Sequence, residues 1–393
     1  MEQAVVNARG AERWRRRGHP WIYRSDVLEP PAGAAGAVVV LGPRRQWLGV
    51  ALWSPSSQIA LRLLCVEERP IDEEFFRERV SAARAYRERL ALDATAFRLV
   101  HGEADGLPSL IVDWYAGVLV IEILSAGLEH YREQVVAALV GELAPTGILA
   151  RNDVAVRQHE QLPRTVELLF GAVPEWLEVR EGEVRYLAAP WTGQKTGAFL
   201  DQRENRVRTG ELAAGRALDC FAYHGSFALH LARHAAHVTA VDSSAEALAR
   251  ARVNIELNGA AAVGSSRAAV ELVAANAFDF LRSEEAAGTR YDTIVLDPPA
   301  FAKRRDALER ALRGYKEINL RALKLLSPGG VLATFSCSYH VSPPRFRELL
   351  ESAAADAGRP VRLLEWRGQS ADHPEVLQIP ESAYLKGAIL RVD

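Results

Sequence analysis

The C-terminal half of the chain alternates short apolar runs with amphipathic stretches, and this alternation limits the fold more than any other feature. Five apolar runs predict strands: Ala217–Phe221, Val238–Val241, Val270–Val273, Thr293–Leu296 and Val331–Phe335. Three stretches between them predict helices: Ser226–His234, Ala245–Leu257 and Leu308–Leu326. Strands that alternate with helices form a parallel sheet covered on both faces. We therefore expect an α/β domain over residues 191–393, with ligands at the carboxyl ends of its strands.

Two smaller units are expected before this domain. Residues 1–70 predict a β-rich unit, because Gly, Pro and Ser turns separate three apolar runs: Ala37–Leu41, Trp47–Trp53 and Ile59–Cys65. Residues 71–190 predict a middle α+β unit with a helix from Asp72, the expected N-cap, to about Leu92. Further strands and one helix are expected there at Leu110–Val112, Val118–Leu124 and Tyr131–Leu143. A length of 393 residues agrees with two or three domains.

Composition excludes several classes of protein. The chain is 49% hydrophobic and 25% charged, which is typical of globular proteins, and no apolar run is long enough to span a membrane. The N-terminal arginines are not followed by the apolar core of a secretory signal. Cys65, Cys220 and Cys337 lie far apart, which argues against a disulfide framework or a metal site. These features favour a cytoplasmic protein without a membrane partner.

Residues suited to a cofactor follow three successive predicted strands: Asp219, Phe221, Tyr223 and Gly225 after the first, Asp242 after the second and Asn276 after the third. A glycine turn lets the backbone approach a ligand, and a carboxylate that closes the second strand can accept ribose hydroxyls. A dinucleotide site would need more glycines, whereas the acidic first strand end suits a cationic ligand such as S-adenosylmethionine. Asn276 could hydrogen-bond an adenine edge. Each carboxylate alone could instead be a helix cap or turn former.

The fourth and fifth predicted strands end in residues suited to catalysis. Asp297 is followed by two prolines and by Phe301, which could stack on a base. Cys337 lies between two serines at the expected carboxyl edge, a position that favours a nucleophile over a packed thiol. We interpret Cys65 and Cys220 as packed thiols.

A methyl donor beside a thiol indicates a particular chemistry. Carbon 5 of cytosine or uracil is a poor nucleophile, but addition of a thiolate to carbon 6 makes carbon 5 reactive. An acid near N3 neutralises the charge that develops, and Asp297 is the candidate for that acid.

The chain resembles the ribosomal RNA large subunit methyltransferase I family, the cytosine-5 enzymes with an N-terminal PUA domain. The resemblance covers essentially the whole length and rests on these motifs: Gly18–Tyr23, His101–Pro108, Ile111–Asp113, Gly193–Arg206, Asp297–Phe301, Ser336–Ser338, Asp372–Pro374 and Tyr384–Lys386. The chain departs from the family pattern in two places: His224 and Ser226 replace Thr and Gly around Gly225, and Asn276 replaces Asp.

The resemblance implies a PUA-like RNA-binding domain at 1–70, a middle domain at 71–190 and a Rossmann-like methyltransferase domain at 191–393. It implies S-adenosylmethionine as the donor, a cytosine of 23S rRNA as the acceptor, Cys337 as the nucleophile and a homodimer. It also implies cofactor contacts from the junction segment, at Phe199, Asp201 and Arg203.

The N-terminal region carries an excess of positive charge that suits RNA. Residues 1–65 hold nine arginines, no lysine and four acidic residues, although the formal net charge of the chain is -2. The residues expected to bind RNA interleave with aromatic rings: Arg13, Arg15, Arg16, Arg17 and His19. A solvated basic surface would carry the same arginines, and Trp21 and Tyr23 are expected in the core.

Two other functions also fit the sequence. A purine N-methyltransferase would use a strand-terminal acid followed by prolines but would need no thiol. A non-catalytic RNA-binding assembly factor would keep the cofactor pocket and transfer no methyl group. Replacement of Cys337 separates the cytosine-5 reaction from the first of these, because only that reaction needs the sulfur.

Overall fold

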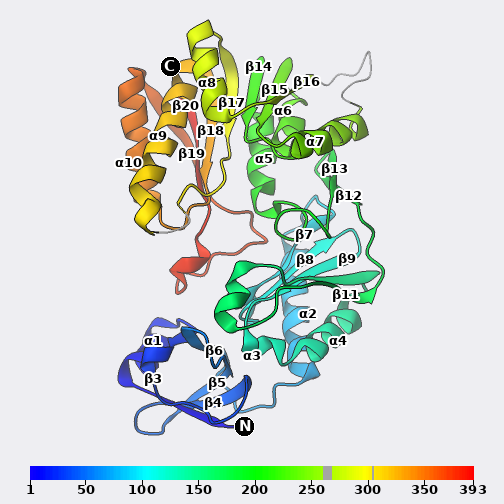
Figure 1. Cartoon of the computed structure of the whole chain (residues 1–393), viewed down its shortest axis with the longest axis vertical. Helices are drawn as coiled ribbons and strands as arrows, with labels where there is room; N and C mark the ends of the chain where they lie inside the picture. Colours follow the sequence, from blue (N-terminus) through cyan, green and yellow to red (C-terminus); the bar gives the residue numbers. More distant parts are fainter. Residues whose placement is uncertain (260–267, 303–304) are drawn as a thin grey trace. The chain divides into compact units, whose positions relative to one another are not determined.

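The computed structural model describes residues 1–259, 268–302 and 305–393 (Figure 1). These residues form two compact units, each assembled from three stretches of the chain. The first unit comprises Met1–Val179, Ala188–Leu200 and Ala371–Ser382, and the second comprises Arg180–Leu187, Asp201–Ser370 and Ala383–Asp393. This division does not test the limits of the three expected domains, which stay a prediction. Among the described helices, none combines the length and apolar character needed to cross a bilayer.

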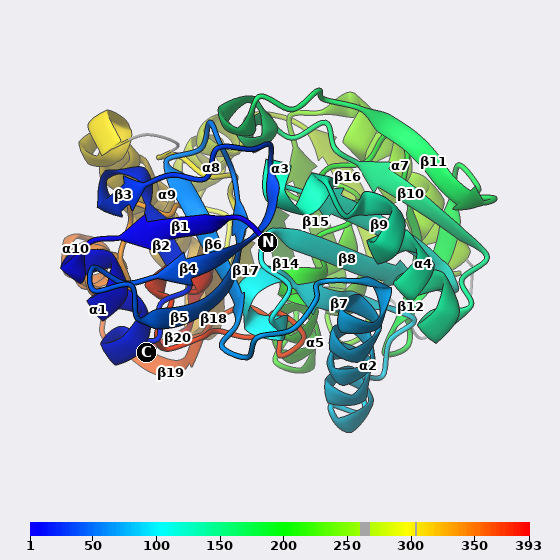
Figure 2. The ribbon, with the colours of Figure 1, turned by 90° about the horizontal axis from the view of Figure 1, so that it is seen from below.

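A six-stranded mixed sheet begins the first unit (Figure 2). Its strands are β1 (Gln3–Val6), β2 (Trp21–Tyr23), β3 (Val27–Glu29), β4 (Gly36–Leu41), β5 (Trp47–Trp53) and β6 (Ile59–Cys65), in the order β2-β6-β5-β4-β1-β3. The last three confirm the predicted strands. The helix α1 (Ala8–Arg17) was not predicted, because its sequence is mostly polar and only Gly10 and Ala11 are buried. Asn7 caps its start and Gly18, in the left-handed region, ends it.

A second sheet of the first unit has five strands in the order β11-β10-β9-β8-β7. The strands are β7 (Ala96–His101), β8 (Leu110–Tyr115), β9 (Val118–Ile123), β10 (Gly147–Arg151) and β11 (Val166–Gly171). The helices of this region are α2 (Glu73–Arg89), α3 (Ala126–Glu129) and α4 (Arg132–Leu143). Asp72 caps α2 as predicted, since its carboxylate accepts a hydrogen bond from the Phe75 backbone N–H at 3.1 Å. Buried side chains of α2, α4 and the sheet share one core. Two further strands, β12 (Leu177–Glu181) and β13 (Val184–Ala188), form a two-stranded sheet.

The second unit contains a seven-stranded sheet in the order β16-β15-β14-β17-β18-β20-β19. Its strands are β14 (Arg216–Cys220), β15 (His237–Asp242), β16 (Ala269–Ala274), β17 (Tyr291–Leu296), β18 (Leu326–Ser336), β19 (Val361–Arg367) and β20 (Lys386–Val392). The five predicted strands, β14 to β18, pair in parallel and confirm the α/β class. The antiparallel strands β20 and β19 were not predicted, so the sheet is mixed.

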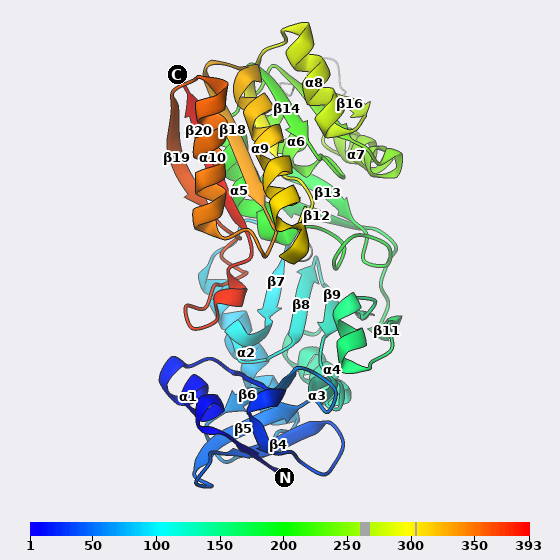
Figure 3. The ribbon, with the colours of Figure 1, turned by 60° about the vertical axis from the view of Figure 1, so that its left-hand side comes forward.

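Helices cover both faces of this sheet, as predicted. They are α5 (Arg203–Glu211), α6 (Ser226–Leu231), α7 (Ala245–Leu257), α8 (Ala277–Ala287), α9 (Leu308–Leu325) and α10 (Pro343–Ala357). Figure 3 shows α9 and α10 along one face. Neighbouring residues of β14 point to opposite faces, so Leu218 packs with residues of α8, α9 and α10, whereas Ala217 packs with residues of α6. Residues at the carboxyl ends of the strands are thereby held by rigid elements on both sides.

Candidate active site

The carboxyl ends of four neighbouring parallel strands bring the predicted site residues to one edge of the sheet. Cys220 of β14 pairs with Val241 of β15 and with Leu296 of β17, and Leu296 pairs with Thr334 of β18. Asp219, Asp242, Asp297 and Cys337 stand within a few residues of these pairs at the same edge. A ligand at this edge can therefore meet all three carboxylates and the thiol.

Asp219 is the most buried of these carboxylates, with 1% of its surface exposed. Its Oδ2 accepts a hydrogen bond from the Ala228 backbone N–H at 2.9 Å, whereas its buried Oδ1 has no hydrogen-bond partner among the described residues. Burial raises the pKa of Asp219 well above its ordinary value, and the nearby carboxylates of Asp297 and Asp242 raise it further. A buried acceptor without a donor, among three carboxyl groups, suits a ligand that carries positive charge and N–H groups.

The turn after β14 has an unusual backbone conformation. Phe221, Tyr223 and Gly225 all lie in the left-handed region, with φ of 67°, 49° and 83°. For the two aromatic residues this conformation costs on the order of 1–3 kcal/mol each, which the surrounding structure must offset. A Cβ added at Gly225 would lie 3.2 Å from the Cβ of Ala251. A side chain at this position would therefore be strained by the positive φ and crowded by Ala251, whereas the predicted cofactor contact of Gly225 stays a prediction.

Asp242 links this turn to the second strand. Its Oδ2 accepts a hydrogen bond from the Tyr223 backbone N–H at 2.8 Å, and its Oδ1 accepts one from the Ser244 N–H at 2.8 Å. Asp242 is half-buried, so the remaining lone pairs of its carboxylate can meet a ligand. The predicted contact with ribose hydroxyls fits this position and stays a prediction.

Asn276 and Phe301 both take part in local packing. The Asn276 side chain caps α8, because its Oδ1 accepts a hydrogen bond from the Phe278 backbone N–H at 2.9 Å. The Phe301 ring lies 4.6 Å from the Tyr315 ring and 6.3 Å from the Phe221 ring, between centroids. The predicted contacts of Asn276 with adenine and of Phe301 with RNA involve these same side chains and stay predictions.

Asp297 is oriented by residues to which the sequence analysis gave no role. Gln202 Nε2 donates a hydrogen bond to Asp297 Oδ1 at 2.8 Å, and Asn205 Nδ2 donates to Gln202 Oε1 at 2.6 Å. Gln202 and Asn205 both stand in the junction motif 193–206, so the motif was visible although the contact was not. These bonds hold the half-buried carboxylate in place beside the prolines that follow it.

Cys337 differs from the other cysteines in exposure. Cys65 and Cys220 are buried, as predicted, and burial raises the pKa of both thiols. Cys337 is half-buried, and its Sγ lies 4.0 Å from the backbone oxygen of Pro298, the residue after Asp297. Among the three thiols, Cys337 alone combines access to solvent with a place at the site.

The junction segment contributes two buried residues to the second unit. Asp201 Oδ2 accepts a hydrogen bond from the Tyr384 hydroxyl at 2.8 Å, which ties the segment to the chain just before β20. Arg203, at the start of α5, is buried, and its guanidinium lies 3.5 Å from the Glu204 carboxylate. Phe199 belongs to the first unit, where the Lys195 ammonium lies 4.7 Å from its ring centroid. The predicted cofactor contacts of these three residues stay predictions.

A buried charged network lies behind the cofactor turn. Arg206 of α5 makes two hydrogen bonds to the Glu181 carboxylate, at 2.8 and 2.6 Å, and His230 Nε2 lies 2.9 Å from it. Burial opposes ionisation of Glu181, but the Arg206 guanidinium lowers the pKa of that carboxyl well below its ordinary value. Beside this network the His224 ring stacks on Tyr186, with centroids 5.2 Å apart. Burial and, secondarily, the Arg206 charge lower the pKa of His224 to about 3.

The predicted RNA-binding residues are found on and after α1, in the first unit. Arg13 lies over the Tyr23 ring at 4.5 Å, and Arg15 donates a hydrogen bond to the Trp47 backbone oxygen at 2.7 Å, so both also hold the fold. Arg16 and Arg17 are exposed. His19, the fifth candidate, is half-buried. Trp21 and Tyr23, which were expected in the core, are also half-buried. Arginines that are partly fixed and partly exposed can meet phosphates, and this role stays a prediction.

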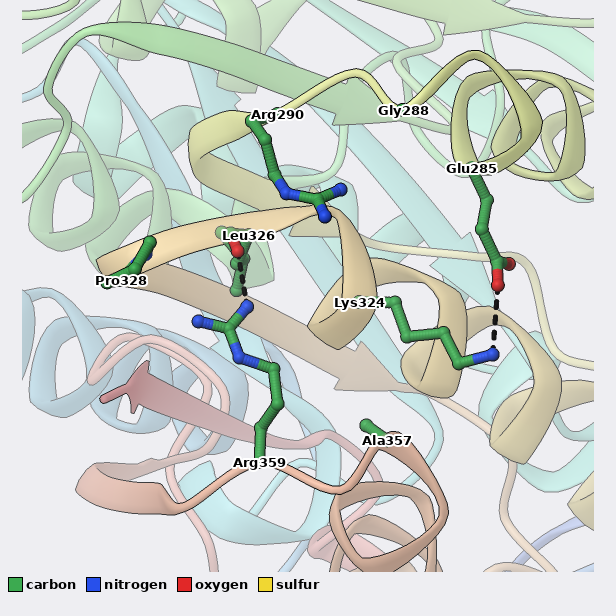
Figure 4. Close-up of a pocket in the computed structure, with 8 residues that line it drawn as sticks. All are labelled: Glu285, Gly288, Arg290, Lys324, Leu326, Pro328, Ala357 and Arg359. Atoms are coloured by element: carbon green, nitrogen blue, oxygen red, sulfur yellow. Dashed lines mark hydrogen bonds and ion pairs between the residues drawn. The ribbon is translucent and has the colours of Figure 1, made fainter.

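A hollow of about 550 Å³ lies at the other edge of the large sheet, where β17 and β18 begin. Figure 4 shows the residues that line it: Glu285, Gly288, Arg290, Lys324, Leu326, Pro328, Ala357 and Arg359. Arg359 donates hydrogen bonds to the backbone oxygens of Leu323 and Leu326, and Lys324 is 2.9 Å from Glu285. The side chains of Arg359 and Lys324 thus stabilise the C-terminal end of a helix, where positive charges are favoured. The hollow contains none of the predicted site residues, so we do not assign it to the reaction.

Comparisons with known proteins agree with this arrangement. Residues 97–391 match the S-adenosylmethionine-dependent methyltransferase family, and residues 6–65 match the PUA-like domain. Ribosomal RNA large subunit methyltransferase I of Erwinia tasmaniensis is 40% identical over 400 residues, which cover 100% of both chains. The enzyme of the same name from Shewanella amazonensis is 40% identical over 393 residues, which cover 98% of each. The chain belongs to the ribosomal RNA large subunit methyltransferase I family.

Solved structures show the same fold as this family member. A chain from Streptococcus mutans, assigned as an S-adenosylmethionine-dependent methyltransferase, is 21% identical with a TM-score of 0.83, and the match covers 100% of both chains. An assigned methyltransferase solved in complex with SAH is also 21% identical, with a TM-score of 0.84 over 100% of both chains. The predicted Rossmann-like methyltransferase domain and PUA-like domain are therefore confirmed.

S-adenosylmethionine is the cofactor of this family member, as predicted. The residues at the sheet edge fit it. The Oδ1 of Asp219, which has no hydrogen-bond partner among the described residues, can accept from an ammonium group. A bound cation would in turn favour the ionised form of Asp219 and of the neighbouring carboxyl groups. The positive φ of Gly225 and its close packing on Ala251 keep the turn free of a side chain at this position.

Proposed function

We propose that this chain methylates carbon 5 of a cytosine in 23S rRNA, with Cys337 as the covalent nucleophile and Asp297 as the acid. The observation that carries the proposal is the half-buried thiol of Cys337 at the same sheet edge as Asp297 and the cofactor carboxylates. The names of the relatives support ribosomal RNA as the substrate. A homodimer in the cytoplasm stays a prediction that goes with this function.

The reaction depends on what the protein side chains do to the pyrimidine ring. The thiolate of Cys337 adds to carbon 6, and the pair of electrons released from the ring double bond makes carbon 5 nucleophilic. Asp297, if protonated at that moment, donates a hydrogen bond to N3 and stabilises the charge that the ring gains. S-adenosylmethionine supplies the methyl group when it is bound. A base then takes the proton of carbon 5, the double bond re-forms and Cys337 leaves as thiolate.

The N-terminal arginines support the choice of RNA as substrate. The residue range that matches the PUA-like domain, 6–65, includes α1 and its arginines. We propose that Arg13, Arg15, Arg16, Arg17 and His19 bind the RNA backbone and that Phe301 stacks on a base near the reacting ring. Such a surface would hold the RNA through phosphates, with little dependence on sequence.

The decisive experiment traps the covalent step. The protein is incubated with S-adenosylmethionine and an rRNA fragment that carries 5-fluorocytidine, whose fluorine cannot leave as a cation. We expect a protein–RNA complex that survives denaturation and that is lost in Cys337→Ser. Normal methylation of ordinary RNA by Cys337→Ser would refute the proposal and favour methylation of a purine nitrogen. RNA binding without methyl transfer by the unmodified chain would instead favour a non-catalytic assembly factor.

A further inference from the structure

Lys386 is a buried lysine in direct hydrogen-bond contact with the segment that carries Cys337. It begins β20 and pairs with Ser336, the residue before the cysteine. Only 3% of its surface is exposed. Its Nζ donates hydrogen bonds to the backbone oxygen of Ser338 at 2.6 Å and to that of Tyr384 at 3.1 Å. A lysine in such a place must either lose its charge or have an anion to stabilise it.

We propose that the ammonium group of Lys386 stabilises the thiolate of Cys337, so that Lys386 is the positioning residue that prepares the nucleophile. The use of this thiolate in catalysis rests on the proposed function. Its ionisation does not, because a thiolate can form without RNA or cofactor. The two bonds from Nζ account for two of its three N–H groups and fix the ammonium next to the cysteine segment. A cation at this place favours the ionised thiol.

The charge of Lys386 is available at neutral pH. Burial lowers the pKa of Lys386 to about 8, and the neighbouring Cys337 opposes this shift by raising it. The lysine is therefore mostly protonated below pH 8. The interaction is reciprocal: the negative charge of a Cys337 thiolate favours the protonated lysine, and the protonated lysine favours the thiolate.

Other titratable groups belong to the elements around the thiol. On α9, the Tyr315 hydroxyl lies 2.9 Å from Ser338 Oγ, and burial raises its pKa, so it is neutral. After β17, Asp297 Oδ1 accepts a hydrogen bond from Gln202 Nε2. An ionised Asp297 would oppose a thiolate, whereas the neutral acid used in the proposed reaction would not. The Tyr384 hydroxyl donates to Asp201. Of these groups, all in the part of the chain that the structure describes, Lys386 is the cation, so we expect its removal to raise the pKa of the thiol.

The test measures the rate of alkylation of Cys337 by iodoacetamide as a function of pH, with Cys337→Ser as the blank for the two buried thiols. We expect the unmodified thiol to titrate below about pH 7.5. In Lys386→Gln, which keeps a donor but no charge, the midpoint should rise by about one unit or more. For each unit, the rate below both midpoints should fall about threefold and the plateau at high pH should rise about threefold, because thiolates of higher pKa are more reactive.

Two further variants separate charge from structure. Lys386→Arg keeps the cation and should keep the low midpoint, whereas Lys324→Gln, a lysine at the other edge of the sheet, should change nothing. Midpoints that coincide in Lys386→Gln and the unmodified protein would overturn the proposal. A thiol of the unmodified protein that titrates at or above about 8.5 would also overturn it, even if the variants do not fold. A low midpoint without 5-methylcytosine would refute the proposed function and leave this inference standing.

Discussion

His224 makes the folded chain sensitive to acid, and its contribution can be worked out from the structure. The ring is 4% exposed, stacks on Tyr186 and has a pKa of about 3. In the unfolded chain a histidine titrates near 6.5. Between these two values the unfolded state binds a proton and the folded state does not, so stability falls as the pH falls. From pH 7 to pH 5 the loss is about 2 kcal/mol, at ~1.4 kcal/mol for each pH unit below 6.5.

The measurement compares His224→Asn with the unmodified chain in urea denaturation at both pH values, followed by circular dichroism. The substitution changes packing equally at both pH values. The difference in the free energy of unfolding between the two proteins is therefore compared at pH 7 and pH 5, and its change reports the effect of protonation alone. We expect that change to be about 2 kcal/mol, with the variant less sensitive to acid. The exposed His234, replaced in the same way, is the matched control and should give a change near zero. A change below about 0.5 kcal/mol for His224→Asn would refute the reasoning.

Three other outcomes follow from the geometry. Gly225→Ala, whose new Cβ would press on Ala251, should weaken binding of SAH about tenfold or more in calorimetry. Gly288→Ala, at a glycine that also has a positive φ but no close neighbour, should not weaken it, and equal losses in the two variants would contradict a role for the contact with Ala251. Glu181→Gln should lower the free energy of unfolding by about 3–5 kcal/mol because it leaves a guanidinium buried, but Glu183→Gln, at a side chain 72% exposed, by less than about 0.5. Arg16→Glu, at a side chain 81% exposed, should reduce the salt dependence of rRNA binding measured by fluorescence anisotropy, and an unchanged slope would exclude a phosphate contact.

The parts of the fold that could be predicted are those written in local patterns. The strands β14 to β18 are short apolar runs between turns. Asp72 could be predicted as the N-cap of α2 because it precedes apolar residues that recur at helical spacing. The polar helix α1 has no apolar period, so only its caps, Asn7 and Gly18, could have indicated it. The antiparallel strands β19 and β20 depend on partners far along the chain, which no local pattern specifies.

The same limit applies to the site. Residues at the strand ends could be predicted, because the carboxyl edge of a parallel sheet is a general place for ligands. The contacts of Gln202 with Asp297 and of Lys386 with the cysteine segment join positions 95 and 48 residues apart. Both residues stand in motifs that were recognised, but spacing alone could not tell which partner each one meets. The three-dimensional structure was needed to give them roles.

For the strand-end carboxylates, a structural role in the turns and the predicted role in cofactor binding are compatible. Asp219 and Asp242 do hold backbone N–H groups, as turn formers and caps would. An ionised carboxylate, however, has about four lone-pair sites, and each of these bonds uses one. Asp219 keeps a buried oxygen that has no partner within the described part of the chain, although such an oxygen is unfavourable in a folded protein. Its retention is explained if the bond to the backbone fixes the carboxylate so that the other oxygen meets the cofactor without rearrangement. The structural bond is then the means by which the site is preorganised.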